Sequence, residues 1–129
     1  MKTSENRTIA IVKSNLCSPD LYTRVKGIIE KMGFTPTFAE SSGSNYSNQY
    51  IIDAVGVIAI GYHSDDNFEK MRFVGKGSYS EINLAMQQGK PIIYTDQGKF
   101  YHINALVEHN PKDWTKEYGA VHLGNHISF

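Results

Sequence analysis

Short apolar runs alternate with amphipathic stretches along the chain. The runs at residues 7–15 ("RTIAIVKSN"), 54–62 ("AVGVIAIGY") and 90–96 ("KPIIYTD") are rich in β-branched and other apolar residues, so they predict buried strands. The run at 54–62 is apolar at nearly every position, which is typical of a central parallel strand covered by helices on both sides. A weaker run at 34–40 ("FTPTFAE") contains a proline and predicts an edge strand.

Helical spacing of apolar residues appears between these runs. After the start signal Ser18-Pro19-Asp20, apolar residues recur every three or four positions until Gly33. The stretch 78–88 ("SYSEINLAMQQ") is also amphipathic and is closed by Gly89. These two patterns predict the main helices of the fold.

Four further segments have weaker patterns. We expect a brief helix at 48–53 ("NQYIID"), a long binding loop at 63–77, a short helix at 100–110 ("FYHINALVEHN") and a last strand at 119–124 ("GAVHLG"). Strands and helices alternate along the whole chain, which predicts a single α/β domain at residues 1–129. The expected architecture is a three-layer, Rossmann-like or flavodoxin-like sandwich around a mostly parallel sheet of about five strands.

Composition narrows the class of protein and of ligand. The chain has 129 residues, 40% hydrophobic and 20% charged, which is in the range of a globular domain that buries its own core. It has no apolar run long enough for a membrane span, no secretory leader and a single cysteine, so we expect a cytoplasmic protein. With a formal net charge of zero, it lacks the basic field that attracts long nucleic acid, and a small ligand is favoured.

The topology predicts where that ligand binds. In open α/β sheets, ligands lie outside the carboxyl ends of the parallel strands. The segments expected at this edge are Ser14 and Asn15 after the first strand, Tyr62 to Asp66 after the central strand, the turn from Gly75 to Glu81, and Thr95 and Asp96.

The turn "GKGS" and the glutamate that follows it are the main candidates for chemistry. Gly75 and Gly77 allow a backbone to approach a ligand closely, and a helix that starts at Ser78 offers free amides to an anion, with Lys76 as an added cation. Ser78-Tyr79-Ser80-Glu81 also fits a capping box, in which Glu81 closes the helix start. Glu81 is therefore a candidate nucleophile, a structural cap, or both.

The segments "DAVGVIAIGY" and "GKGSYSEINLAMQQGKPIIY" together resemble the nucleoside 2-deoxyribosyltransferase-like superfamily, which includes deoxynucleoside monophosphate N-glycosidases. The resemblance covers about residues 50 to 96 by motif. It implies that Glu81 is a nucleophile that attacks C1′ of a ribose or deoxyribose, after which water or a second base completes cleavage or transfer. It also implies a nucleoside or nucleotide ligand and a homodimer or larger homo-oligomer.

The chain departs from the family pattern at one position that the chemistry needs. The aspartate that protonates the leaving base in the family is replaced here by a segment around Asn45, and Asp66 is the candidate substitute as general acid. This departure leaves open a non-catalytic module that senses or sequesters a nucleotide. A third interpretation is an enzyme similar to phosphoribohydrolases or to NAD-cleaving TIR domains, whose glycine and glutamate signatures are partly present.

We expect neither a metal site nor a cofactor. The histidines lack the close spacing to one another or to carboxylates that zinc sites have. Tyr46 and Tyr50, four residues apart, resemble one face of a helix and are interpreted as packing residues. The residues expected to hold the ligand are Ser14, Asn15, Tyr62, Gly75, Lys76, Gly77 and Ser78, with Glu81 and Asp66 as the catalytic pair.

Overall fold

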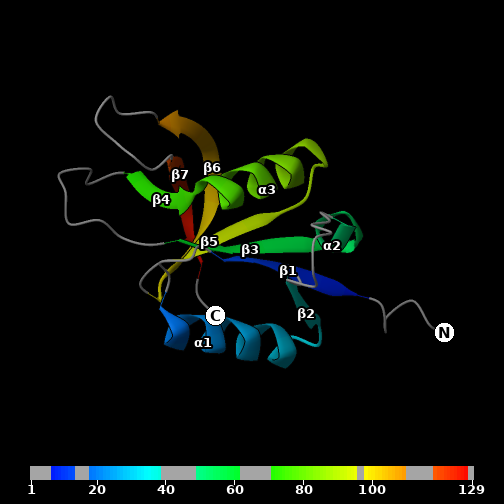
Figure 1. The fold of residues 1–129 in the computed structure, drawn as a ribbon. Helices are drawn as coiled ribbons and strands as arrows, with labels where there is room; N and C mark the ends of the chain where they lie inside the picture. Colours follow the sequence, from blue (N-terminus) through cyan, green and yellow to red (C-terminus); the bar gives the residue numbers. More distant parts are fainter. Residues whose placement is uncertain are drawn as a thin grey trace.

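The computed structural model describes residues 7–13, 18–38, 49–61, 71–95, 98–109 and 118–127, which form one sheet flanked by helices (Figure 1). The sheet order is β2-β1-β3-β5-β6-β7-β4. The strands are β1 (Thr8–Lys13), β2 (Thr35–Phe38), β3 (Gly56–Ile60), β4 (Met71–Gly75), β5 (Ile92–Thr95), β6 (Phe100–His109) and β7 (Tyr118–Ile127).

The sheet has a parallel half and an antiparallel half. Strands β2, β1, β3 and β5 pair in parallel, in the manner of a Rossmann-like sheet. Strand β6 is antiparallel to β5, β7 to β6, and β4 to β7. Because two reversals restore the direction, β7 points the same way as the parallel half, so most of the strands share one direction. The α/β class is confirmed, with a mixed sheet of seven described strands where about five were expected.

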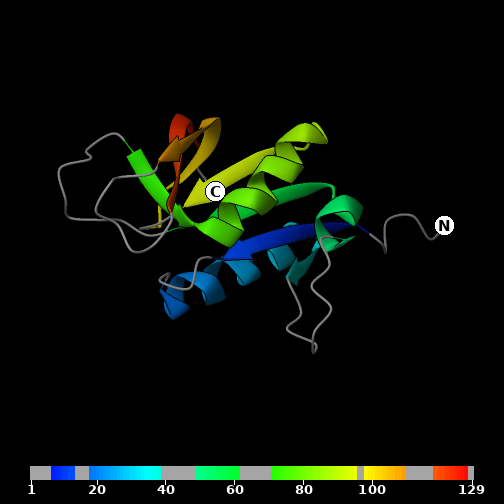
Figure 2. The same ribbon diagram turned by 45° about the horizontal axis from the view of Figure 1, so that its top comes forward.

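Helices cover both faces of the sheet. Helix α1 (Pro19–Lys31) lies on one face, and α2 (Gln49–Asp53) and α3 (Lys76–Gln87) lie on the other (Figures 1 and 2). The side chain of Ser18 accepts a hydrogen bond from the amide of Leu21 and caps α1, as its start signal predicts. Gly89 follows α3 with a φ of 69°, a conformation that glycine adopts easily at a helix end. No helix within the described ranges is long and apolar enough to cross a membrane.

Successive side chains of the central strands point to opposite faces of the sheet, so the core is divided into two clusters, one on each face. The α1 face receives large side chains from β1 and β3, namely Ile9, Ile11, Ile58 and Ile60, which pack with Leu21, Val25 and Ile29 of α1. The opposite face receives smaller ones, Ala10, Val12, Val57 and Ala59, which pack with Ile51, Ile82 and Ala85. Strand β3 is buried at every position, so the expectation of a central strand covered on both sides is confirmed.

Two predicted segments have different structures. Residues 100–110 were expected to form a short helix, but 100–109 form β6, which pairs with β5 through Ile93 and His102. The apolar residues Phe100 and Ile103 have a spacing that suits one face of a helix. As a strand, however, the segment makes backbone hydrogen bonds with the outer edge of β5, and this pairing favours the strand over the helix. The expected long loop at 63–77 contains β4 and the start of α3.

The edge position of the proline-bearing strand is confirmed. Strand β2 lies at one end of the sheet and pairs only with β1 among the described strands. Pro36 lies within it, and proline is tolerated at an edge because it has no amide hydrogen to donate to a further strand. The other end of the sheet is formed by β4, so α3 begins directly after an edge strand.

Candidate functional site

The junction between β4 and α3 is tighter than the sequence predicts. Strand β4 runs through Gly75 and α3 begins at Lys76, so Gly77 lies in the first helical turn. The expectation of an open glycine turn before a helix start at Ser78 is therefore wrong. Helical apolar spacing begins only at Tyr79, which is why the sequence suggested the later start. The proposed roles of Gly75, Lys76, Gly77 and Ser78 in ligand binding stay predictions.

This junction also changes the interpretation of Glu81. Ser78 is the third residue of α3 and not its N-cap, and the first turn contains no acidic residue. Glu81 is the sixth residue, about 7.5 Å along the axis from the helix start at 1.5 Å per residue. The capping-box interpretation is therefore wrong. Glu81 therefore lies beyond the first turn, to which the favourable effect of the helix dipole is confined.

Glu81 is instead a buried carboxylate with a phenol as partner. Its exposed fraction is 6%, and Ile82 and Ala85, its neighbours on α3, are fully buried in the apolar cluster on this face. The hydroxyl of Tyr50 in α2 donates a hydrogen bond to Oε2 of Glu81. A buried carboxylate needs such a donor because its loss of hydration is costly. The pair joins residues 31 positions apart in the sequence.

Helix α2 is held at its far end as well. The ammonium group of Lys90, just before β5, donates to the carbonyl oxygens of Ile52 at 2.9 Å and Ala54 at 2.5 Å. These are two of the carbonyls that a helix end leaves without an internal partner. Lys90 therefore fixes the end of α2, and through α2 it supports the position of the Tyr50 hydroxyl against Glu81.

The predicted packing role of Tyr50 is only half of what the residue does. Its ring packs against the buried cluster on the α3 face, as the helical spacing suggested, and its hydroxyl reaches the carboxylate of Glu81. A single sequence contains no signal for this pairing, because it depends on how α2 and α3 pack together. Tyr50 is thus a candidate site residue that the sequence analysis did not identify.

Hydrogen bonds join the segments at the carboxyl ends of the neighbouring strands β3 and β5. The amide of Gly61 donates to the carbonyl oxygen of Thr95 at 3.0 Å, and the amide of Gly98 donates to the Thr95 hydroxyl at 3.3 Å. Thr95 is fully buried, and its hydroxyl holds the amide of Gly98 close to the end of β5. Helix α3 returns the chain to β5, which is parallel to β3, so α3 begins on the side to which these strands point (Figure 2).

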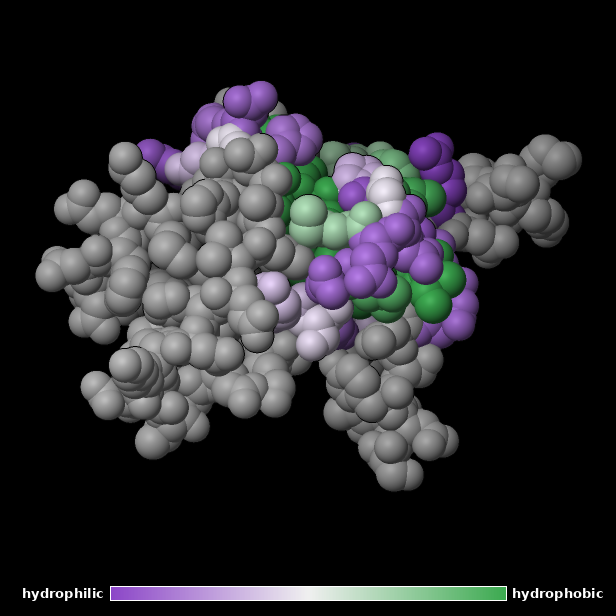
Figure 3. Space-filling model, turned by 90° about the horizontal axis from the view of Figure 1, so that it is seen from above, coloured by the Kyte–Doolittle hydropathy of each residue, from purple (hydrophilic) through white to green (hydrophobic). Residues whose placement is uncertain are grey.

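The outer surface over α3 is mixed in character. Asn83, Met86 and Gln87 are exposed, and the described part of this face carries hydrophilic and hydrophobic side chains next to each other (Figure 3). Glu81 lies on the inner side of the same helix. Its carboxylate is therefore separated from the exposed polar groups of α3 and is grouped with Tyr50.

Several predicted site residues lie outside the described ranges. These are Ser14, Asn15, Tyr62 and Asp66. Among the candidates, the structure brings the carboxylate of Glu81 together with Tyr50 and gives the backbone course of residues 75 to 78. Asp53, the last residue of α2, is exposed and accepts a hydrogen bond from Gln49 at 2.9 Å. No group of three or more residues that could hold a metal ion occurs in the described part of the chain.

The chemistry available to the Glu81–Tyr50 pair follows from its parts. A carboxylate can act as a nucleophile or stabilise a developing positive charge, and a phenol can orient it by a directed hydrogen bond. The same pair can also serve simply to hold α2 against α3. No protein-family model matches the chain, and no similar curated protein or solved structure was found.

Proposed function

We propose that this protein cleaves or transfers the N-glycosidic bond of a nucleoside or nucleotide, with Glu81 as the nucleophile. The observation that carries the proposal is a carboxylate with an exposed fraction of only 6%, held by a phenol, on the helix that precedes β5. A carboxylate at this depth is costly to retain for structure alone, because burial removes its hydration.

The order of elements around Glu81 supports the proposal. The resemblance to the nucleoside 2-deoxyribosyltransferase-like superfamily rests on an Asp-Ala pair before a buried strand, a glutamate and alanine on a helix, and Gly-Lys before the next strand. Asp53 and Ala54 lie shortly before β3, Glu81 and Ala85 lie on α3, and Lys90 lies shortly before β5. Strands β3 and β5 are parallel neighbours. The pieces of the motif thus lie around β3 and β5. As part of the same proposal, we infer that the fold is flavodoxin-like.

The proposed reaction has two displacements. A carboxylate oxygen of Glu81 attacks C1′, a C1′–O bond forms, and the C1′–N bond breaks with its electron pair leaving on the base. Asp66 supplies the proton to the departing base. In the second displacement, water in hydrolysis or a second base in transfer attacks C1′ and gives up a proton to the Asp66 carboxylate, while the C1′–O bond to Glu81 breaks and releases the Glu81 carboxylate. The hydrogen bond from Tyr50 to Oε2 orients the carboxyl plane, so Oε1 is the oxygen assigned to the attack.

The remaining parts of the proposal concern ligand and assembly. The ligand is a small nucleoside or nucleotide, and the protein acts as a homodimer or larger homo-oligomer without a metal or cofactor. The residues assigned to the ligand are Ser14, Asn15, Tyr62, Gly75, Lys76, Gly77 and Ser78. The amides at the start of α3 suit an anionic group of the ligand, because they are not used within the helix.

The test is base release by Glu81→Gln protein. Glutamine keeps the shape and still accepts a hydrogen bond from Tyr50, but it does not form the covalent intermediate. We expect base release, measured by chromatography over a panel of nucleosides and nucleotides, to fall by about 10³-fold or more. Glu30→Gln on the exposed surface of α1 is the matched control and should keep full activity. Equal rates for the wild-type and Glu81→Gln proteins would refute the mechanism.

A second candidate function is supported by the same hydrogen bond. If Tyr50 occupies the carboxylate permanently, the pair is structural and the protein is a module that senses or sequesters a nucleotide. Thermal-shift measurements separate the two functions, because stabilisation by a nucleotide that is recovered unchanged supports the module. Including NAD and adenosine monophosphate in the panel tests the alternative of a phosphoribohydrolase-like or TIR-like enzyme.

A further inference from the structure

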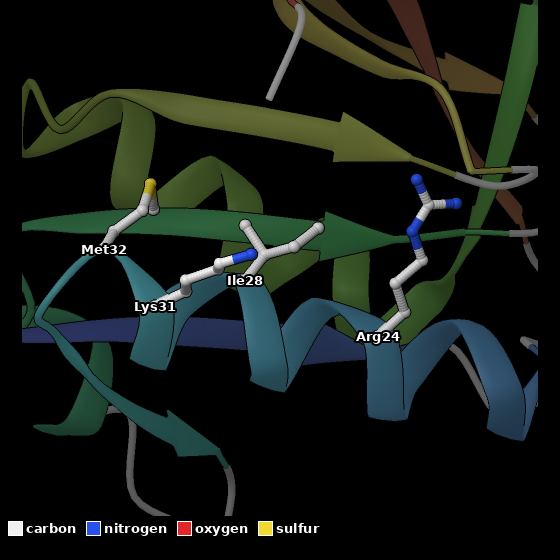
Figure 4. A pocket seen from close by; sticks show the side chains of 4 residues that line it. All are labelled: Arg24, Ile28, Lys31 and Met32. Atoms are coloured by element: carbon white, nitrogen blue, oxygen red, sulfur yellow. The ribbon is translucent and has the colours of Figure 1, made fainter.

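A groove runs along one flank of α1, on the face of the sheet opposite Glu81. It is lined by Arg24, Ile28, Lys31 and Met32 and encloses about 350 Å³. These side chains extend from α1 on the same side of the helix (Figure 4). Ile28, Lys31 and Met32 come four, seven and eight residues after Arg24. At these spacings the four residues form one continuous stripe along the helix.

The groove lies where a neighbouring helix would pack. In α/β folds both faces of the sheet are covered by helices that lie side by side about 8–10 Å apart. In the described chain, α2 and α3 share one face, whereas α1 is alone on the other (Figure 1). No other described helix packs against this flank of α1, and Met32, at its far end, has an exposed fraction of 40%. A flank of this shape suits a helix.

The positive charges of the groove favour a docked helix that carries acidic residues. Arg24 and Lys31 place two positive charges about 10.5 Å apart along the axis, with Ile28 between them. The described residues that line the groove include no acidic side chain. The guanidinium of Arg24 lies 5.9 Å from the centre of the Phe100 ring, and this contact restrains it at one end of the groove. The complementary surface has two negative charges with an apolar side chain between them.

We propose that this groove docks an amphipathic helix of a different protein, with two acidic residues seven positions apart and an apolar residue midway. Two helical turns match the spacing of Arg24 and Lys31, and the midway residue reaches Ile28 and the adaptable side chain of Met32. A second copy of this chain is a poor occupant, because its own α1 would bring the same two cations to the contact. The exposed polar positions Asn83 and Gln87 of its α3 are uncharged.

The test uses a synthetic helical peptide of about three heptads that carries two glutamates seven residues apart and a leucine midway. We expect it to bind the full chain, to shift the amide resonances of residues 24–32, and to bind more weakly as salt is raised. Lys31→Glu should weaken binding about fivefold or more. Lys26→Glu is the matched control, since it makes the same charge change on α1 outside the groove and should leave the affinity unchanged.

A charge-swapped peptide completes the test. Replacing its two glutamates by lysines should abolish binding to the wild-type chain and restore part of the binding to Lys31→Glu protein. Three outcomes would overturn the proposal: no binding at about 1 mM peptide, equal weakening by Lys26→Glu and Lys31→Glu, or concentration-dependent self-association that covers residues 24–32. A small anionic molecule that binds the groove while the peptide does not would overturn it as well.

Discussion

Removing the hydroxyl of Tyr50 tests the central contact of the site. The Tyr50→Phe protein keeps the ring that packs on the buried cluster but leaves Glu81, with an exposed fraction of 6%, without its phenol donor. Hydrogen bonds to a charged group contribute about 1.5–3 kcal/mol. We expect the free energy of unfolding to fall by about 2 kcal/mol and the Tm to fall by roughly 6–10 °C for a domain of this size.

The assay is urea denaturation followed by far-UV circular dichroism, with a double-mutant cycle against Glu81→Gln. Because glutamine is uncharged, removal of the hydroxyl in that background should cost only about 0.5–1.5 kcal/mol, and the difference measures the charged part of the bond. Tyr79→Phe is the matched control, because Tyr79 also packs against the cluster but makes no hydrogen bond to another described side chain. A Tyr50→Phe protein within 0.5 kcal/mol of wild type would show that the hydrogen bond does not stabilise the fold.

Two further substitutions test the supports around the site. Lys90→Met should lower the free energy of unfolding by about 2 kcal/mol, since the carbonyls of Ile52 and Ala54 lose a charged donor, and denaturation in urea measures it. Gly98→Ala should destabilise by about 1–2 kcal/mol, because its φ of 97° is unfavourable for an L-residue with a side chain. Gly27→Ala, in open space within α1, should instead stabilise by about 0.5–1 kcal/mol, and equal effects in thermal melts would contradict the argument.

The parallel half of the fold could be predicted because local signals and tertiary packing agree there. Strand β3 is apolar on both faces, α1 has a serine cap and a final glycine, and β2 contains the proline of an edge strand. Each of these patterns has one physical solution in an α/β sheet. The sequence therefore predicted their type and their place correctly.

The antiparallel half could not be predicted in the same way. Residues 100–109 carry apolar side chains at spacings that suit either a helix or a strand, and the free edge of β5 decides between them. Residues 71–75 form a strand only because β7, more than 40 residues later in the chain, pairs with them. Non-local pairing of this kind leaves little trace in a short window of sequence.

At the candidate site, the sequence predicted the helix that carries Glu81 but not the contacts of its side chain. A glutamate on a helix before a buried strand made Glu81 a candidate, and the structure shows that this residue is buried. The capping role failed because the helix starts at Lys76, which no strong start signal marks. Tyr50 was missed because its partner depends on the packing of α2 on α3.

The division of the core by the sheet has a practical consequence for engineering. The large isoleucines of β1 and β3 pack with α1, whereas the smaller side chains on the other face lie beneath α3, and the two clusters share no residue. Substitutions in separate clusters tend to add without coupling. Stability can therefore be raised by redesign on the α1 side while the surroundings of Glu81 stay untouched, which gives a stable background in which destabilising variants of the candidate site remain folded.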